Sequence, residues 1–142
     1  MLDSEVGDLR EVLVRLAREV ADAALHAGEY VVLAESCTAG LVAHTVSLIP
    51  GVSEWFCGSA VVYRNETKTA WLQVPPEQLE DPRVGPVSRA TAAAMCRGVL
   101  ARTPQATLAL SITGHLGPHA PPEQDGLMYL GVATASANAS TS

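Results

Sequence analysis

Four short apolar runs, rich in β-branched residues, alternate along this chain with stretches of helical periodicity. The runs are Tyr30–Ala34 and residues 55–63, 107–113 and 127–135. Between them, apolar residues recur at steps of three and four over residues 4–27, 38–49 and 89–102, and a shorter helix is expected over 65–73. This alternation predicts an α/β fold, a three-layer α/β/α sandwich around a mostly parallel, mixed sheet.

Capping residues predict where several of these elements begin and end. Ser4 is suited to start the first helix and Gly28 to end it, and Ser88 is a favoured N-cap for the helix over 89–102. The proline-rich residues 74–86 predict a connector, and the Gly/Pro-rich residues 114–126 a long loop. With 142 residues, the chain is expected to form one domain with a frayed polar tail over 136–142.

Charge and cysteine content exclude several classes of protein. The net charge is −6, with 9 Lys and Arg against 15 Asp and Glu, which is unsuited to binding nucleic acid. The three cysteines form no C-x-x-C pair, which favours a reducing cytoplasm over a disulfide framework. The N-terminus is acidic and amphipathic, unlike a signal peptide, and no apolar run approaches the ~18 residues that span a bilayer. We therefore expect a cytoplasmic protein without membrane contact.

Polar segments follow three of the predicted strands. They are residues 35–38 (Glu-Ser-Cys-Thr), 63–65 (Tyr-Arg-Asn) and 113–115 (Thr-Gly-His). In parallel α/β sheets, ligands bind beyond the carboxyl ends of the strands. The three segments are therefore expected to meet at one edge and form a site.

Ser36 and Cys37 are both candidate nucleophiles in the first of these segments. They stand where a strand turns into a helix, whose first N–H groups can hold an oxyanion or a phosphate. Ala39 and Gly40 would let a ligand approach the backbone. In a purely structural alternative, Ser36 or Thr38 only caps the helix, and Cys37 is a packing residue.

Lys68, the only lysine of the chain, is a candidate general base. This role requires burial or a neighbouring cation to lower its pKa, and Tyr63 would orient or relay the proton. The alternative is a solvated surface lysine. His115 and His119 have a metal-like spacing, but neighbouring glycine and prolines preclude a regular helix there, and no third ligand is evident. We expect no metal.

Several motifs together resemble the C-terminal domain family of the competence/damage-inducible protein CinA. They are AESCTAG (34–40), PGVSEWFCGSAVVYRNETK (50–68), GPVS (85–88), SITGHLGP (111–118) and GLMYLGVA (126–133), and the resemblance covers about residues 8–135. Stand-alone members of this family are nicotinamide-nucleotide amidases of the PncC type. They convert nicotinamide mononucleotide to nicotinate mononucleotide and ammonia, without a metal or organic cofactor.

The resemblance implies an acyl-enzyme mechanism with Ser36 as nucleophile, Lys68 as base and Tyr63 as its partner. The N–H groups at the start of the 38–49 helix would hold the oxyanion. The residues assigned to substrate binding are Glu35, Thr38, Ala39, Gly40, Arg64, Asn65, Thr113 and Gly114, the last four of them for the ribose-phosphate. Two alternatives remain: an amidase acting on a different small amide, and a non-catalytic module that binds a nucleotide.

The chain departs from the family pattern in three places. Ala39 replaces a glycine, which matters if this position needs a positive φ angle. His115 and the following residues replace a glycine-rich loop, which bears on the identity of the substrate. Family members usually continue after the last predicted strand with a further strand and helix. We therefore expect exposed apolar surface here, which a homodimer or higher homo-oligomer would cover.

Overall fold

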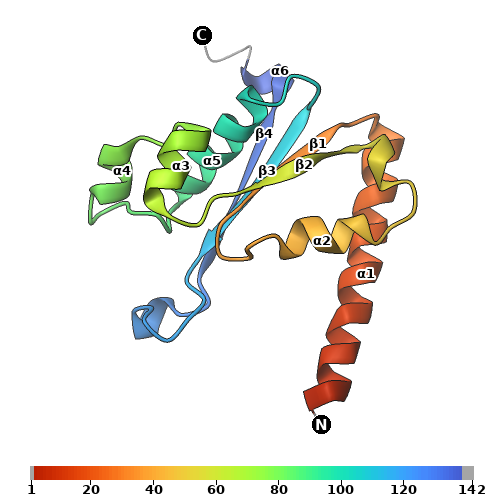
Figure 1. Cartoon of the computed structure of the whole chain (residues 1–142), viewed down its shortest axis with the longest axis horizontal. Coiled ribbons are helices and arrows are strands. Elements are labelled where there is room, and N and C mark those ends of the chain that lie inside the picture. The colour runs from red at the N-terminus through yellow and green to blue at the C-terminus, as the bar shows by residue number, and fades with distance from the viewer. Residues whose placement is uncertain (1, 139–142) are drawn as a thin grey trace.

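The computed structural model describes residues 2–138 as one sheet between two layers of helices (Figure 1). The strands are β1 (Val31–Glu35), β2 (Phe56–Val61), β3 (Leu108–Gly114) and β4 (Met128–Thr134). Their order is β2-β1-β3-β4, where β1 runs parallel to both neighbours and β4 runs antiparallel to β3. The predicted α/β/α sandwich with a mixed sheet is confirmed.

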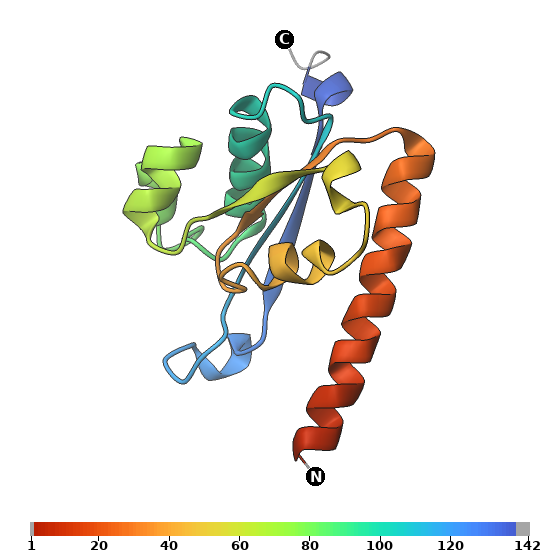
Figure 2. The same cartoon turned by 45° about the vertical axis from the view of Figure 1, so that its right-hand side comes forward.

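The two helical layers cover opposite faces of the sheet (Figure 2). One layer contains α1 (Leu2–Ala27) and α2 (Leu41–Ser47), and the other contains α3 (Asn65–Leu72), α4 (Pro76–Glu80) and α5 (Arg89–Ala101). Short 3-10 helices at Val52–Glu54 and Pro122–Gln124 and the terminal α6 (Ala135–Asn138) complete the chain. Each of the described helices is too short or too polar to span a lipid bilayer.

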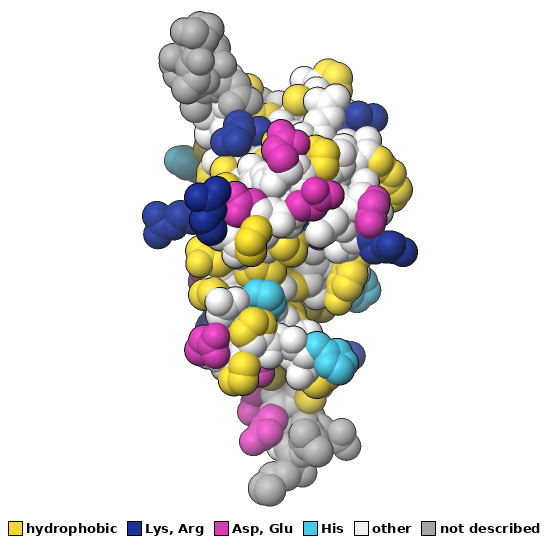
Figure 3. All heavy atoms as spheres, turned by 90° about the vertical axis from the view of Figure 1, so that its left-hand side faces the viewer, with side chains coloured by type: hydrophobic (Ala, Val, Ile, Leu, Met, Phe, Trp, Pro, Cys, Tyr) yellow, Lys and Arg dark blue, Asp and Glu magenta, His cyan; other side chains and the backbone are white. Residues whose placement is uncertain are grey.

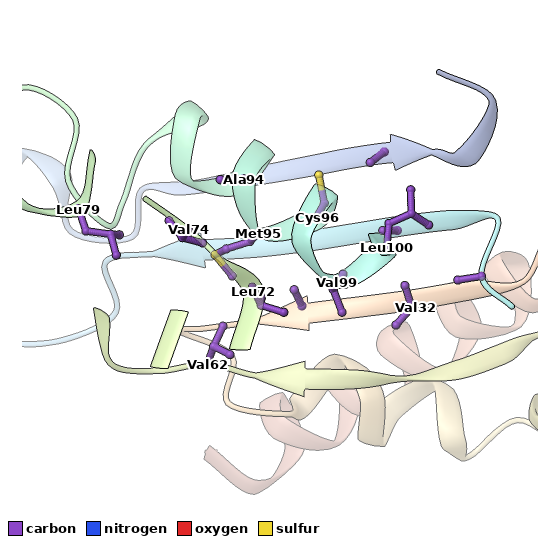
Figure 4. Packing of buried hydrophobic residues seen from close by; sticks show 14 residues of the cluster. Val32, Val62, Leu72, Val74, Leu79, Ala94, Met95, Cys96, Val99 and Leu100 are labelled. Carbon is purple, nitrogen blue, oxygen red and sulfur yellow. The ribbon is translucent and has the colours of Figure 1, made fainter. Parts of the chain in front are cut away.

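The side chains of β1 alternate between the two layers, as its nearly all-apolar sequence requires. Val31 and Leu33 pack with α1 and α2, whereas Val32 and Ala34 pack with α3 and α5. Figure 4 shows the second of these clusters, with side chains of α5 extending toward the sheet. Helices α3 and α5 approach each other closely at Gly98 of α5, where a Cβ atom would lie 2.0 Å from the carbonyl oxygen of Leu72 in α3.

Most predicted boundaries agree with the structure to within one or two residues. The Ser88 hydroxyl accepts a hydrogen bond from the Thr91 N–H at 3.1 Å, and Gly28 follows α1 with φ +68°. Two predictions are wrong. The helix expected from residue 38 begins only at Leu41, and the proline-rich connector contains α4, whose first residue is Pro76, a position that needs no N–H donor.

The predicted frayed tail is partly helical, because α6 includes residues 135–138, and residues 139–142 lie outside the described part of the chain.

On the α1 face of the sheet, Leu130 and Val132 of β4 are 73% and 67% exposed. Along α1, five exposed apolar side chains form a stripe at alternating steps of three and four: Val6, Leu9, Leu13, Leu16 and Val20. The expected exposed apolar surface is present.

Candidate active site

The carboxyl ends of β1, β2 and β3 meet at one edge of the sheet. The strand ladders continue to this edge, where Ser36 N–H donates to the Ile112 carbonyl at 3.0 Å and Val62 N–H donates to the Glu35 carbonyl at 2.8 Å. Glu35 lies on the α2 side of the sheet, because its carboxylate binds N–H groups of that helix, and Ser36 follows directly after the end of β1. From the alternation of side chains along a strand we infer that Ser36 faces the other side of the sheet, the side of α3 and Lys68.

The Ser36 side chain is buried and does not cap α2. Its hydroxyl makes no hydrogen bond within residues 2–138, and the N-cap of α2 is Gly40, which provides no side-chain acceptor. Thr38 is not the cap either, since its hydroxyl donates to the Glu35 carboxylate. The alternative in which Ser36 or Thr38 merely caps the helix is wrong, and the Ser36 hydroxyl is left without a structural partner in the described chain.

Glu35 supplies the cap from the preceding strand. Its carboxylate accepts hydrogen bonds from the N–H groups of Val42 at 2.9 Å and Ala43 at 3.1 Å, while the Leu41 N–H donates to the Thr38 carbonyl. Glu35 is 1% exposed and its carboxylate is engaged with α2, so the described structure shows no free surface of Glu35 for the expected contact with substrate. The same bonds correct the expected oxyanion site, because these first N–H groups of the helix are already occupied.

Lys68 is buried on α3, with 1% of its surface exposed. Its Nζ donates to the main-chain carbonyl of Tyr63 at 2.7 Å. Burial lowers the pKa of Lys68 below its ordinary value, and the nearby Cys37 side chain raises this pKa by a smaller amount. The solvated-lysine alternative is wrong, and the electrostatic coupling places Lys68 close to the residue that follows Ser36.

Tyr63 contacts Lys68 through its backbone. Tyr63 is 64% exposed, and the bond to Lys68 Nζ uses the carbonyl oxygen. We expected the Ser36 hydroxyl, Lys68 Nζ and the Tyr63 phenol to lie within hydrogen-bond reach of one another, but no hydrogen bond joins any two of these groups within residues 2–138. A sequence motif names the residue but does not show whether its side chain or its main-chain carbonyl makes the contact with Lys68.

Cys37 lies beside the same edge in a form unsuited to attack. Burial raises the pKa of its thiol above the ordinary value, although the N–H groups of Cys37 and Thr38 and the charge of Lys68 lower it. The thiolate is the nucleophilic form, so this thiol is largely unreactive at neutral pH. Its sulfur packs against Gly114, where a Cβ atom would lie only 3.2 Å from Sγ.

The remaining residues assigned to substrate binding are placed differently from one another. Arg64 is exposed and paired with Glu66 at 3.3 Å, and Asn65 begins α3. The hydroxyl of buried Thr113 donates to the Pro86 carbonyl at 2.7 Å. Gly114 lies at the site next to Cys37. Ala39 adopts φ +51°, so the position that departs from the family glycine does require the left-handed conformation.

A cavity of about 510 Å³ lies beside this edge and was not expected from the sequence. Its lining includes Arg83 of the α4–α5 connection, Arg89 at the start of α5, His115 of the 114–126 loop and Tyr129 of β4. Figure 3 shows this face, with hydrophobic side chains gathered between charged groups above and histidines below. No periodicity indicated this cavity, since it is formed by loops that are distant in sequence. Within residues 2–138, no group of three or more acidic, histidine or cysteine side chains is arranged to hold a metal.

Comparison with known proteins matches residues 13–142 to the model of the CinA C-terminal domain. The chain belongs to the CinA C-terminal domain family. A CinA-like protein of Solibacter usitatus is 41% identical over 136 residues, which are 94% of this chain and 30% of that protein. A CinA-like protein of Myxococcus xanthus is 48% identical over 92 residues, 65% of this chain and 21% of that protein. This CinA-type domain thus spans less than a third of these relatives.

Solved structures show the same fold. The competence/damage inducible protein CihA from Agrobacterium tumefaciens has a TM-score of 0.80 and 35% identity, covering 87% of this chain and 74% of that one. The competence damage-inducible protein A from Klebsiella pneumoniae has a TM-score of 0.79 and 27% identity, covering 86% and 75%.

Proposed function

We propose that this CinA-type domain is a serine amidohydrolase that deamidates nicotinamide mononucleotide to nicotinate mononucleotide and ammonia. The observation that carries the proposal is the burial of Lys68, which lowers the pKa of this lysine beside the segment that holds Ser36. A lysine acts as a general base only in its neutral form, and burial favours that form. The hydroxyl of Ser36, which makes no hydrogen bond within residues 2–138, is the matching nucleophile.

In the proposed reaction, neutral Lys68 takes the proton of the Ser36 hydroxyl as Oγ attacks the carboxamide carbon. The C–N bond then breaks, and the departing nitrogen takes the proton from Lys68 to leave as ammonia. Water, deprotonated by the same lysine, hydrolyses the acyl ester and returns the serine. The Tyr63 carbonyl holds Nζ in place throughout, at 2.7 Å.

Most of the N–H groups assigned to the oxyanion from the sequence are occupied, so the donors must lie closer to Ser36. Across residues 36–43, the N–H groups of Ser36, Ala39, Leu41, Val42 and Ala43 already have acceptors. We propose that the N–H groups of Cys37 and Thr38, directly after the nucleophile, take this role. They already lie near a partly buried sulfur, whose pKa they lower.

The cavity of about 510 Å³ is the proposed place of the nucleotide, since ligand pockets are typically ~300–1,000 Å³. It adjoins the site, because His115 on its wall follows Gly114, which packs against Cys37. His115 also supports a second candidate, an amidase for a different small amide. We place the reaction in the cytoplasm, because all three cysteines are free.

The test is ammonia release from nicotinamide mononucleotide. We expect Ser36→Ala and Lys68→Ala each to lower kcat by a factor of about 10³ or more, since the two residues act as a unit. Cys37→Ala is the matched control and should retain most of the activity. Unchanged turnover in Ser36→Ala would exclude the nucleophile. Ammonia from other amides alone would favour the second candidate, and tight binding without turnover a binding module.

A further inference from the structure

We propose that Glu35 is a positioning residue, whose carboxylate fixes the turn that presents Ser36 for attack. The inference rests on the proposed function, since it assigns Ser36 the role of nucleophile. It gives Glu35 a task different from the substrate contact that the sequence indicated.

Four hydrogen bonds saturate the Glu35 carboxylate within the described residues. Oε1 accepts from the Thr38 hydroxyl at 2.8 Å and from the Val42 N–H at 2.9 Å. Oε2 accepts from the Ala43 N–H at 3.1 Å and from the Ser59 hydroxyl at 2.8 Å. A carboxylate offers about four lone-pair sites. With 1% of its surface exposed, Glu35 has neither a free acceptor nor solvent access with which to contact a substrate.

These bonds join the end of β1 to three other segments. Thr38 belongs to the turn after Ser36, Val42 and Ala43 to the first turn of α2, and Ser59 to the middle of β2. In the sequence, Ser36 stands between Glu35 and Thr38, which the carboxylate joins by a hydrogen bond. Its own N–H and carbonyl are held as well, by the Ile112 carbonyl and the Ala39 N–H, both at 3.0 Å. The backbone of Ser36 is therefore fixed on both sides, while its hydroxyl makes no hydrogen bond to the described part of the chain.

The turn needs such support because it contains an unfavourable conformation. Ala39 has φ +51°, a region that costs a residue with a side chain free energy unless surrounding contacts enforce it. The carboxylate also accepts hydrogen bonds from the N–H groups of Val42 and Ala43, so these two N–H groups are not available to bind the oxyanion. The N–H groups of Cys37 and Thr38 are then the donors that remain next to Ser36.

Glu35→Gln tests the inference with little change of shape. The glutamine amide group keeps one acceptor oxygen and replaces the other with a donor. Whichever way it is oriented, its NH2 group faces either the Val42 or the Ala43 N–H, which then has no acceptor. We expect kcat for nicotinamide mononucleotide to fall at least tenfold and KM to change less than twofold, because positioning acts on the transition state.

The control separates positioning from stability. Thr107 lies at the opposite edge of the sheet, where its hydroxyl accepts from the Tyr30 N–H at 2.9 Å and contacts Glu29. Thr107→Val should lower the melting temperature without lowering kcat at temperatures where the protein is folded. If Glu35→Gln does not fold, Thr38→Val removes only the bond within the turn and should lower kcat at least threefold, with Thr38→Ser restoring it.

A second readout is independent of the substrate. Phenylmethanesulfonyl fluoride reacts with activated serines, and intact mass would give the labelling rate of Ser36. We expect Glu35→Gln to be labelled at least tenfold more slowly than the unmodified protein. If the protein labels at Ser36 but releases no ammonia, the proposed substrate fails and the inference survives. Labelling and kcat unchanged in Glu35→Gln would overturn the inference alone. No labelling and no ammonia from the unmodified protein would overturn both.

Discussion

Replacing Ala39 with glycine should stabilise this domain, although Ala→Gly changes usually do the opposite. Ala39 has φ +51° in the turn between β1 and α2, and its methyl group is exposed. A left-handed conformation costs a residue with a Cβ atom about 1–2 kcal/mol, and glycine adopts it freely. Since the methyl group is exposed, its removal sacrifices little packing.

The expected gain follows from two opposing terms. Relief of the left-handed conformation contributes about 1–2 kcal/mol, and the greater freedom of glycine in the unfolded chain removes about 0.4–1 kcal/mol. The net stabilisation is about 0.5–1 kcal/mol. For a chain of 142 residues this should raise the melting temperature by about 2–4 °C.

Thermal unfolding followed by circular dichroism measures this shift, and Ala23→Gly provides the control. Ala23 is also exposed but lies inside α1, where glycine should lower stability by about 1 kcal/mol. The two Ala→Gly changes should therefore move the melting temperature in opposite directions. A decrease for Ala39→Gly similar to that for Ala23→Gly would refute the reasoning that the turn is strained at this position.

Three further predictions concern the base, the core and the exposed face. Burial lowers the pKa of Lys68, so kcat/KM should rise with pH along a limb whose midpoint lies below 10.5; a limb at or above that value would contradict the assignment. Between the lowered pKa of Lys68 in the folded protein and the ordinary value of 10.5, the unfolded chain binds more protons than the folded one, so the free energy of unfolding should also rise with pH. Urea titrations of Lys68→Met should show that this pH dependence is lost. Gly98→Ala should lower stability by about 1–3 kcal/mol in the same titrations, because its Cβ would meet the Leu72 carbonyl at 2.0 Å; unchanged stability would contradict this packing. We propose that the chain forms a homodimer through the α1 stripe and the exposed Leu130 and Val132, because contact with a second copy would remove these apolar side chains from water. Sedimentation equilibrium should give a dimer that Leu130→Glu with Val132→Glu dissociates, and a monomeric unmodified protein would exclude it.

The sequence predicted the strands well because burial on both faces requires runs of apolar residues. It also placed Ser88 correctly, since an N-cap bond forms within four residues of chain. The position of Pro76 was misinterpreted because a proline both interrupts and begins helices, and only packing of the following turn decides between these effects. The buried Leu79 provides that packing in α4.

The start of α2 could not be predicted from its own residues. Helical periodicity continues back to Thr38, but the helix begins at Leu41 because the carboxylate of Glu35 binds the N–H groups of its first turn. This cap comes from the preceding strand, and the Ser59 bond that helps to hold it comes from β2. Capping preferences consider only the residues next to the helix start, so they favoured Ser36 or Thr38 as the cap. For the same reason, the sequence did not show that the Ser36 hydroxyl makes no hydrogen bond within the described residues.

The two buried charged residues near Ser36 are compensated to very different degrees, and this difference separates their roles. Glu35 accepts four hydrogen bonds, two of them from N–H groups at a helix terminus, so its negative charge is stabilised where it is. Lys68 is equally buried, but its one hydrogen bond in the described chain goes to a neutral carbonyl, so its positive charge is poorly compensated. A buried lysine in this situation has a lowered pKa and releases its proton more easily than a solvated lysine. In the proposed reaction, Ser36 faces Lys68 on the side of the sheet opposite to Glu35, as alternation beyond the end of β1 implies, and the carboxylate of Glu35 supports the turn from the α2 side.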